Sequence, residues 1–311
     1  MLDATSKAFF HSLAQVRLLQ RMASRYGMAP GGGFAHRFIA GESVEDAVAA
    51  VKGVAAQGLL LTLDYLGESV ATTEEADAAT RDYLRILDTI VQSGIERNIS
   101  LKLTQLGLDV DRATCVDNLR RILDPATEHE FFVRIDMENS PYTDVTLQVF
   151  ETLWGQGHRN IGVVLQSYLM RTEADVRRII ALGGRIRLVK GAYKEPKEVA
   201  YQKKSEVDDA YLRLMQLLLD ESTYPAIATH DPVMLDATRD YAARKGYARN
   251  HFEFQMLYGI RRDLQTSLAA EGYPMRIYVP FGEQWFPYFM RRLGERPANI
   301  SFVLKSMLRE R

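Results

Sequence analysis

Eight short apolar segments alternate with helix-length segments from Leu59 onward, and this alternation constrains the fold more than any other feature. The segments predicted to be strands are Leu59–Tyr65, Ile99–Gln105, Glu130–Met137, Ile161–Gln166, Arg185–Lys190, Ala226–His230, Phe252–Leu257 and Met275–Pro280. Eight β-then-α units over about 250 residues are typical of an α/β (β/α)8 barrel. An open, doubly wound sheet also alternates strands and helices, but the absence of GxGxxG and GxxxxGK[ST] motifs disfavours a nucleotide-binding open sheet.

Start and stop signals mark several of the intervening helices. Thr72 with Glu75 predicts a capping box, and Asp231 stands before Pro232 in a predicted first turn. A short helix is predicted over residues 42–57, and residues 1–29 are free of proline. We therefore expect an N-terminal helical arm over residues 1–57 and a catalytic barrel over residues 58–311.

Composition excludes several classes of protein. Lys plus Arg is 39 and Asp plus Glu is 40, so the net charge is -1, and nucleic-acid binding is not expected. The single Cys115 excludes an intrachain disulfide and a multi-cysteine metal site, and the lack of an HExxH motif or a closely spaced histidine pair argues against a bound metal. With no signal-like or membrane-spanning segment, the protein is expected to be cytoplasmic, with peripheral contact at the inner face of the cell membrane left open.

Polar side chains stand at or near the carboxyl ends of the predicted strands, where barrel enzymes place their active sites. They are Asp64, Lys102, Asp136, Gln166, Arg187, Lys190, His230, Glu253, Gln255 and Tyr278. Convergent polar groups on an apolar scaffold indicate a small-molecule site. The alternative is that Lys102, Asp136 and Arg187 form an ion network that only fills the barrel.

The helix predicted after the last strand carries a pattern suited to a carboxylate. Tyr288 precedes Arg291 and Arg292 by three and four residues, and Glu295 follows them at four and three, so all lie on adjoining turns of one face. Two neighbouring guanidiniums repel each other unless an anion neutralises them, and their planar forks fit a carboxylate. A solvated basic face paired with a glutamate is the alternative reading.

Seven motifs together resemble the proline dehydrogenase family and follow the family's order. They are SLKLTQLG, RIDMEN, VVLQSY, RLVKGAY, ATHD, FEFQMLYG, and Y-x-P-F-G followed by YFMRRLGE. The resemblance extends from about Leu59 to Phe302, and the length is similar to that of monofunctional bacterial members. One departure is the stretch from Gly282 to Trp285, which differs from the Thr-His type of sequence in the fused bifunctional enzymes.

The resemblance implies a distorted (β/α)8 barrel that holds FAD non-covalently. It implies oxidation of L-proline to 1-pyrroline-5-carboxylate by hydride transfer from C5 to flavin N5, with the electrons passed to a quinone. This reaction is the first step of proline catabolism to glutamate, and a pyrroline-5-carboxylate dehydrogenase would take the product. A quinone acceptor implies a membrane encounter, for which the amphipathic segment Ile300–Arg309 is a candidate.

The resemblance also implies a role for each matching residue. The expected catalytic residues are Lys102, Asp136 and Arg187. The expected cofactor-binding residues are Met137, Gln166, Arg187, Lys190, Gly191, Ala192, Tyr193, Thr229, His230, Glu253, Gln255 and Leu257. The expected substrate-binding residues are Lys102, Tyr278, Tyr288, Arg291, Arg292 and Glu295, with Glu68 as a candidate partner of Arg291 when substrate closes the site.

Two other functions stay open from the sequence. A Schiff-base aldolase on the same barrel would use Lys102 or Lys190 as its nucleophile, with the arginine pair binding a carboxylate or phosphate. A non-catalytic barrel that senses an amino acid would bind its ligand without chemistry.

Overall fold

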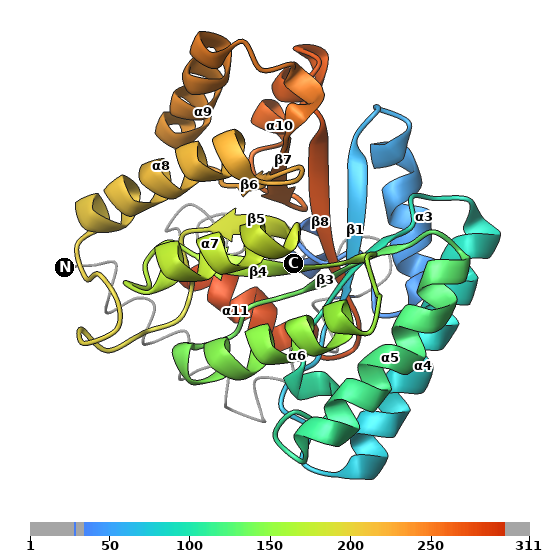
Figure 1. The fold of residues 1–311 in the computed structure, drawn as a ribbon. Coiled ribbons are helices and arrows are strands. Elements are labelled where there is room, and N and C mark those ends of the chain that lie inside the picture. Colours follow the sequence, from blue (N-terminus) through green and yellow to red (C-terminus); the bar gives the residue numbers. More distant parts are fainter. Residues whose placement is uncertain (1–27, 29–33, 296–311) are drawn as a thin grey trace.

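The structure, a computed structural model, describes residue 28 and residues 34–295, with side chains as far as Arg292. Eight parallel strands close into a barrel in chain order (Figure 1). They are β1 (Leu60–Tyr65), β2 (Asn98–Leu101), β3 (Phe132–Ile135), β4 (Ile161–Gln166), β5 (Arg185–Val189), β6 (Ala226–Ala228), β7 (Glu253–Leu257) and β8 (Met275–Phe281). The barrel closes where β1 pairs with β8, from Leu60 opposite Arg276 to Tyr65 opposite Phe281. The predicted fold class is confirmed.

Helices connect the strands and, apart from α11, cover the outside of the barrel. They are α3 (Val44–Ala55), α4 (Thr73–Ser93), α5 (Arg112–Glu128), α6 (Thr143–Gly155), α7 (Thr172–Leu182), α8 (Lys204–Glu221), α9 (Pro232–Lys245), α10 (Arg262–Ala270) and α11 (Trp285–Glu295), with short 3-10 helices η1 (Phe34–Arg37), η2 (Thr104–Leu106), η3 (Ser140–Tyr142) and η4 (Arg249–His251). The capping box predicted at Thr72 and Glu75 is present. None of the described helices is long and apolar enough to cross a membrane.

Several strands are shorter than their apolar segments predicted. The segment from Ile99 to Gln105 ends as a strand at Leu101, and η2 follows. The chain turns there because both the backbone N–H and the hydroxyl of Thr104 donate to the Glu138 carboxylate, at 3.3 and 2.7 Å. An apolar run therefore continues past the end of its strand, and alternation alone does not mark the turn.

The positions of α3 and α11 distort the barrel. Helix α3 precedes the first strand but packs beside β1 and β8 on the outside, next to α4, as Figure 1 shows for α3 and β1. Helix α11 follows β8 yet lies across the carboxyl ends of the strands. Its apolar residues pack with Phe38, with Leu66 after β1 and with Ile260 after β7 in one cluster. The distortion expected from the family resemblance is thus present.

The N-terminal division is only partly within the described residues. Val44, Ala47 and Val51 of α3 belong to the same hydrophobic core as the barrel strands. Most of the proposed arm over residues 1–57, and residues 296–311, lie outside the part of the chain that the structure describes. The domain boundary at residue 57 stays a prediction.

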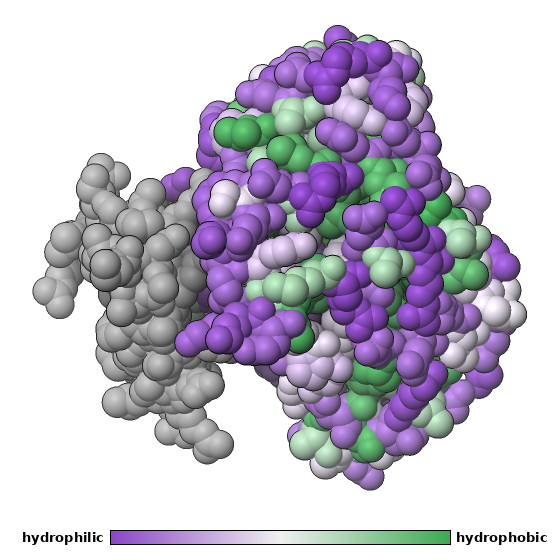
Figure 2. Space-filling model, turned by 60° about the vertical axis from the view of Figure 1, so that its left-hand side comes forward, coloured by the Kyte–Doolittle hydropathy of each residue, from purple (hydrophilic) through white to green (hydrophobic). Residues whose placement is uncertain are grey.

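On the face shown in Figure 2, hydrophobic residues form small groups among hydrophilic ones.

The inside of the barrel is polar and charged at its amino end. Arg276 donates to both carboxylate oxygens of Glu253 at 2.9 Å, to Glu96 at 2.6 Å and to the Leu61 carbonyl at 2.6 Å. Burial alone would raise the pKa of Glu253, but the charge and hydrogen bonds of Arg276 outweigh it and lower the pKa below its ordinary value. The pair is therefore ionised, and each ion depends on the other for its burial.

Substitution Arg276→Met should lower the free energy of unfolding by about 3–5 kcal/mol, because it leaves the Glu253 carboxylate buried without its cation. Since the pKa of Glu253 is lowered on folding, the pair stabilises the protein above the ordinary glutamate value of 4.5, and this contribution is lost as pH falls through the lowered pKa. Urea unfolding at neutral and acidic pH measures both effects. The double variant Arg276→Met/Glu253→Gln should recover part of the loss, and a single variant as stable as the parent would contradict the pairing.

Candidate active site

An arginine of β5 and an aspartate that follows β3 meet inside the barrel near its carboxyl end. Arg187 of β5 donates to Asp136 Oδ1 at 2.8 Å and to the Ser100 hydroxyl at 2.9 Å. The Tyr278 hydroxyl of β8 donates to Asp136 Oδ2 at 2.7 Å, and its ring centroid lies 5.2 Å from the Arg187 guanidinium carbon. Burial and the two nearby aspartates raise the pKa of Tyr278 well above its ordinary value, so its hydroxyl stays protonated and remains a donor.

Lys102 forms a second buried ion pair beside the first. It follows β2, and its Nζ lies 3.6 Å from Asp64 Oδ1 at the end of β1. Burial alone would lower the pKa of Lys102, but the negative charges of Asp64 and Asp136 outweigh it and raise the pKa. Burial raises the pKa of Asp64 against the pull of Lys102. The ammonium of Lys102 is therefore held in its charged form at the carboxyl end of the barrel.

Helix α11 brings the predicted carboxylate clamp over this pair. Arg291 Nη1 donates to Glu68 Oε1 at 3.2 Å, and the Arg292 guanidinium carbon lies 5.2 Å from the Tyr288 ring centroid. Burial alone would lower the pKa of Arg291, whereas Glu68 and neighbouring tyrosines raise it. Glu295 ends the helix, and its side chain lies outside the described residues.

A small cavity joins the clamp to Lys102. Its volume is about 30 Å³. The residues around it are Leu66, Gly67, Glu68, Lys102, Gln284, Pro287, Tyr288 and Arg291. The ammonium of Lys102 and the guanidinium of Arg291 thus face one space, with the Tyr288 ring as part of its wall. Two cations and an aromatic wall around one cavity suit a small carboxylate with an apolar body.

A second group of predicted residues follows the neighbouring strands β4 and β5. Gln166 donates to the Glu138 carbonyl at 3.2 Å, while its Oε1 is buried without a hydrogen-bond partner. Lys190 pairs with Asp208 at 2.5 Å and with Asp231 at 2.8 Å. The predicted cofactor residues Met137 and Thr229 are buried near these strand ends, whereas Ala192 is exposed and Tyr193 partly buried in the loop after β5.

The loop after β5 runs close to an aromatic ring. Gly191 has a φ of +115°, and a Cβ there would lie 2.4 Å from Tyr168. Burial, as the largest cause, raises the pKa of Tyr193 to about 12. On the neighbouring strands, His230 Nε2 accepts a hydrogen bond from the Leu257 N–H at 2.9 Å, which links the ends of β6 and β7.

Glu253 does not join this group. Glu253 is the first residue of β7, at the amino end of the barrel, where it binds Arg276. Gln255, two residues further along the same face, donates to Glu253 and keeps a buried Oε1 without a partner. The sequence predicts Glu253 near the carboxyl end of its strand, but the residue lies at the opposite end of β7.

Several polar residues of the site were missed from the sequence. Ser100 binds Arg187, Glu138 binds Thr104, and Asp208 binds Lys190. Glu195 accepts hydrogen bonds from the Ser140 backbone at 2.7 Å and from the Tyr168 hydroxyl at 3.3 Å, so it ties down the loop after β5. A signal for Ser100 was present in the sequence, because it stands two residues before Lys102 and alternation along a strand puts both on one face. Nothing local to the sequence pointed to Asp208 or Glu195.

A barrel with buried cations that face one cavity at its carboxyl end is typical of enzymes that act on small molecules. A family profile described as proline dehydrogenase matches residues 47–305. Proline dehydrogenase 2 of Bacillus subtilis is 40% identical over 305 residues, which cover 98% of this chain and 99% of that protein. Proline dehydrogenase of Deinococcus radiodurans is 42% identical over 279 residues, which cover 88% of this chain and 90% of that protein. The chain belongs to the proline dehydrogenase family.

A solved structure supports the same fold. Proline utilization A (PutA) from Bdellovibrio bacteriovorus, inactivated by N-propargylglycine, aligns with a TM-score of 0.79 at 28% identity. The alignment covers 84% of this chain and 32% of that chain, so this chain spans about a third of the length of that PutA.

Substitution Asp136→Asn should lower the free energy of unfolding by about 1.5–3 kcal/mol, because Arg187 then keeps only neutral hydrogen-bond partners in a buried position. Asp144→Asn is the matched control, since it breaks an exposed pair with Arg171 of 2.7 Å. An exposed pair contributes about 0–1 kcal/mol. Urea unfolding compares the two variants, and equal losses would show that burial of the Arg187 pair has no special weight.

Proposed function

We propose that this chain oxidises L-proline to 1-pyrroline-5-carboxylate with FAD as a non-covalent cofactor. The observation that carries the proposal is the cavity between Lys102 and Arg291, with Tyr288 in its wall. L-Proline is a small zwitterion whose carboxylate needs cations and whose methylenes need an apolar surface. Membership of the proline dehydrogenase family supports the same substrate.

Arg291 and Arg292 bind the substrate carboxylate in this proposal, with Lys102 also near it. Tyr278 and Tyr288 wall the substrate ring, and Glu295 lies by the amine. The described cavity, at about 30 Å³, is far below the roughly 300–1,000 Å³ of ordinary small-molecule sites. Admission of proline therefore requires the side chains around it to move apart. The Arg291–Glu68 bond joins α11 to the loop after β1 beside this space.

The residues beside β4, β5 and β6 fit a flavin. Gln166 Oε1 and Arg187 Nε are buried without hydrogen-bond partners in the described structure, and both polar atoms suit the edge of a heteroaromatic ring. Gly191 has no side chain, so a bound ring could lie close to the backbone of the loop after β5. The residues assigned to the cofactor are Met137, Gln166, Arg187, Lys190, Gly191, Ala192, Tyr193, Thr229, His230, Gln255 and Leu257. Glu253 is left out because it lies at the opposite end of its strand.

A flavin bound by these residues would supply a two-electron oxidant able to accept a hydride from the substrate. The protein's part is to hold the substrate carbon in place and to offer positive charge where negative charge develops. Arg187 and Lys102 are the cations for this task. Asp136 fixes the direction of Arg187 through their 2.8 Å bond and acts as a positioning residue. A neutral proline amine needs no general base.

The lysine chemistry of an aldolase is disfavoured by the same geometry. A Schiff-base lysine needs a lowered pKa to be nucleophilic. Two aspartates raise the pKa of Lys102, and Lys190 is held between Asp208 and Asp231. A non-catalytic sensor would bind proline without reducing a cofactor, and the test below separates it.

The family resemblance further implies a quinone as electron acceptor and a pyrroline-5-carboxylate dehydrogenase as the next enzyme. The acceptor would be met at a membrane surface. The amphipathic segment Ile300–Arg309 that could lie on such a surface is outside the described residues, so its role stays a prediction. Liposome flotation with and without residues 300–311 tests it, and equal binding would reject it.

The visible spectrum of the purified protein tests the proposed function. We expect flavin bands near about 380 and 450 nm that bleach on anaerobic addition of L-proline. Bands that persist with proline would keep the cofactor and reject the substrate. A colourless protein that FAD does not reconstitute would reject the flavoenzyme.

Substitutions Arg291→Met and Arg292→Met should each raise KM for L-proline by about 100-fold or more, because each removes a charge-assisted contact to the carboxylate. The contact is made before and during the reaction, so KM should change more than kcat. Arg81→Met, at an exposed arginine of α4, is the control and should leave KM unchanged. Unchanged KM in both clamp variants would contradict the assignment.

A further inference from the structure

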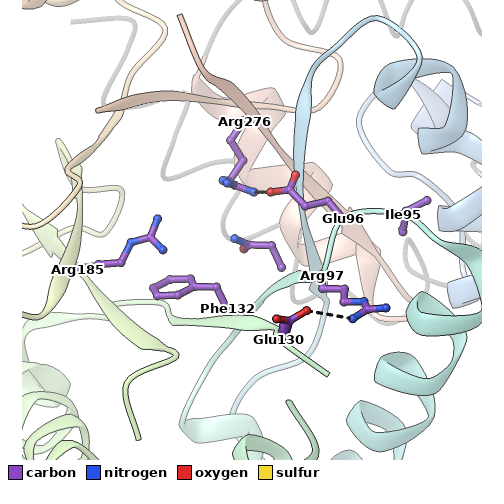
Figure 3. A pocket seen from close by; sticks show the side chains of 8 residues that line it. Ile95, Glu96, Arg97, Glu130, Phe132, Arg185 and Arg276 are labelled. Carbon is purple, nitrogen blue, oxygen red and sulfur yellow. Dashed lines mark hydrogen bonds and ion pairs between the residues drawn. The ribbon is translucent and has the colours of Figure 1, made fainter. Parts of the chain in front are cut away.

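A second cavity opens at the amino end of the barrel, opposite the proposed active site. Its volume is about 540 Å³, within the usual range of small-molecule sites. It is lined by Ile95, Glu96, Arg97, Asn98, Glu130, Phe132, Arg185 and Arg276 (Figure 3). Asn98, Phe132 and Arg185 are the first residues of β2, β3 and β5, which fixes the end of the barrel at which the cavity lies.

Arg185 is the distinctive group of this cavity. Among the described residues its guanidinium makes no hydrogen bond and no ion pair, and its Nε is buried. The guanidinium carbon lies 4.2 Å from the Phe132 ring centroid and 4.6 Å from that of Tyr224. Ring contacts stabilise the cation but leave its buried Nε–H without a hydrogen-bond partner. Figure 3 shows Arg185 directed into the cavity toward Arg276.

The other cations of the cavity already have carboxylate partners. Arg276 pairs with Glu96 at 2.6 Å and with Glu253, and Arg97 lies 3.9 Å from Glu130. Beside them, Arg134 is fully buried and donates to the Arg185 carbonyl at 2.8 Å. Burial is the largest cause that lowers the pKa of Arg185, and the charge of Arg276 adds to it, against the opposing pull of Glu253 and Glu96. A bound anion on Arg185 would offset this concentration of positive charge.

The backbone is held in an unusual conformation at two points around the cavity. Glu130 and Tyr224 have φ values of 58° and 52°, which non-glycine residues rarely adopt. The turn at Tyr224 places its ring on Arg185, and the turn at Glu130 precedes β3 at the cavity wall. Uncommon conformations of this kind cluster at ligand sites.

We propose that the amino-end cavity binds a small organic monocarboxylate through a bidentate hydrogen bond from Arg185. A planar guanidinium edge matches a carboxylate in shape and charge. The Phe132 ring and Ile95 offer apolar surface for the rest of the molecule. A phosphate dianion or a dicarboxylate suits the cavity less, because Arg185 supplies a single unpaired positive charge and Glu96 and Glu130 repel further negative charge.

Isothermal titration with butyrate, succinate and inorganic phosphate at constant ionic strength tests the proposal. The parent protein should be the Arg291→Met variant, since the clamp at the carboxyl end would also bind a carboxylate. We expect one butyrate site with a Kd of about 10 mM or tighter, and weaker binding of succinate and phosphate. In this background Arg185→Gln should weaken butyrate binding by about tenfold or more.

Arg97→Gln is the matched control, because it removes the same charge from the same cavity at an arginine that already faces Glu130. It should change butyrate affinity by less than about twofold if the directional bond to Arg185, and not the general potential, binds the ligand. If Arg185→Gln does not fold, Arg185→Lys takes its place. That variant keeps the charge but loses the planar fork, so binding should still weaken.

Three results would overturn the proposal. They are no butyrate site in the Arg291→Met protein, equal affinity after substitution of Arg185, and tighter binding of phosphate than of butyrate. None of these measurements uses enzyme activity, so they are independent of whether the chain oxidises proline.

Discussion

The buried bond between Arg187 and Asp136 is the interaction on which the site depends. It links β5 to the residue after β3 over the intervening β4, and Tyr278 of β8 joins it from another strand. Charged groups are costly inside a protein unless they are paired, so this bond holds three strands in one arrangement around the carboxyl end. The neighbouring pair of Lys102 and Asp64 follows the same rule and adds a second fixed cation.

A second constraint is the placement of two helices, α3 on the outside of the barrel and α11 over the strand ends. Because α3 covers the outside of the barrel beside β1 and β8, α11 is free to lie across the strand ends. The apolar side of α11 packs on Phe38 and Leu66, and its arginines consequently meet the cavity above Lys102. Apolar packing thus sets where the helix lies. The hydrogen bonds, which need a defined geometry, then set how its charged groups are oriented.

The two ends of the barrel handle charge in different ways. At the carboxyl end, Glu68 pairs with Arg291 beside a cavity of about 30 Å³. At the amino end, a cavity of about 540 Å³ contains Arg185, whose guanidinium forms no ion pair with a carboxylate among the described residues. Amino-end residues of barrels usually serve stability, and Arg276 with Glu253 fits that role. Arg185 does not, which is why a ligand accounts for it better than packing does.

Local patterns along the chain were sufficient for the order of the eight strands, for the helix caps and for the polar residue near each strand end. Periodicity and capping involve residues a few positions apart, so a sequence shows them directly. The end of β2 at Leu101, the amino-end place of Glu253 and the partners of Lys190 needed the folded chain. These depend on contacts between residues far apart in sequence, such as Thr104 with Glu138 and Glu253 with Arg276. No local pattern records such contacts, because the strand register and the packing of helices on the barrel bring those residues together.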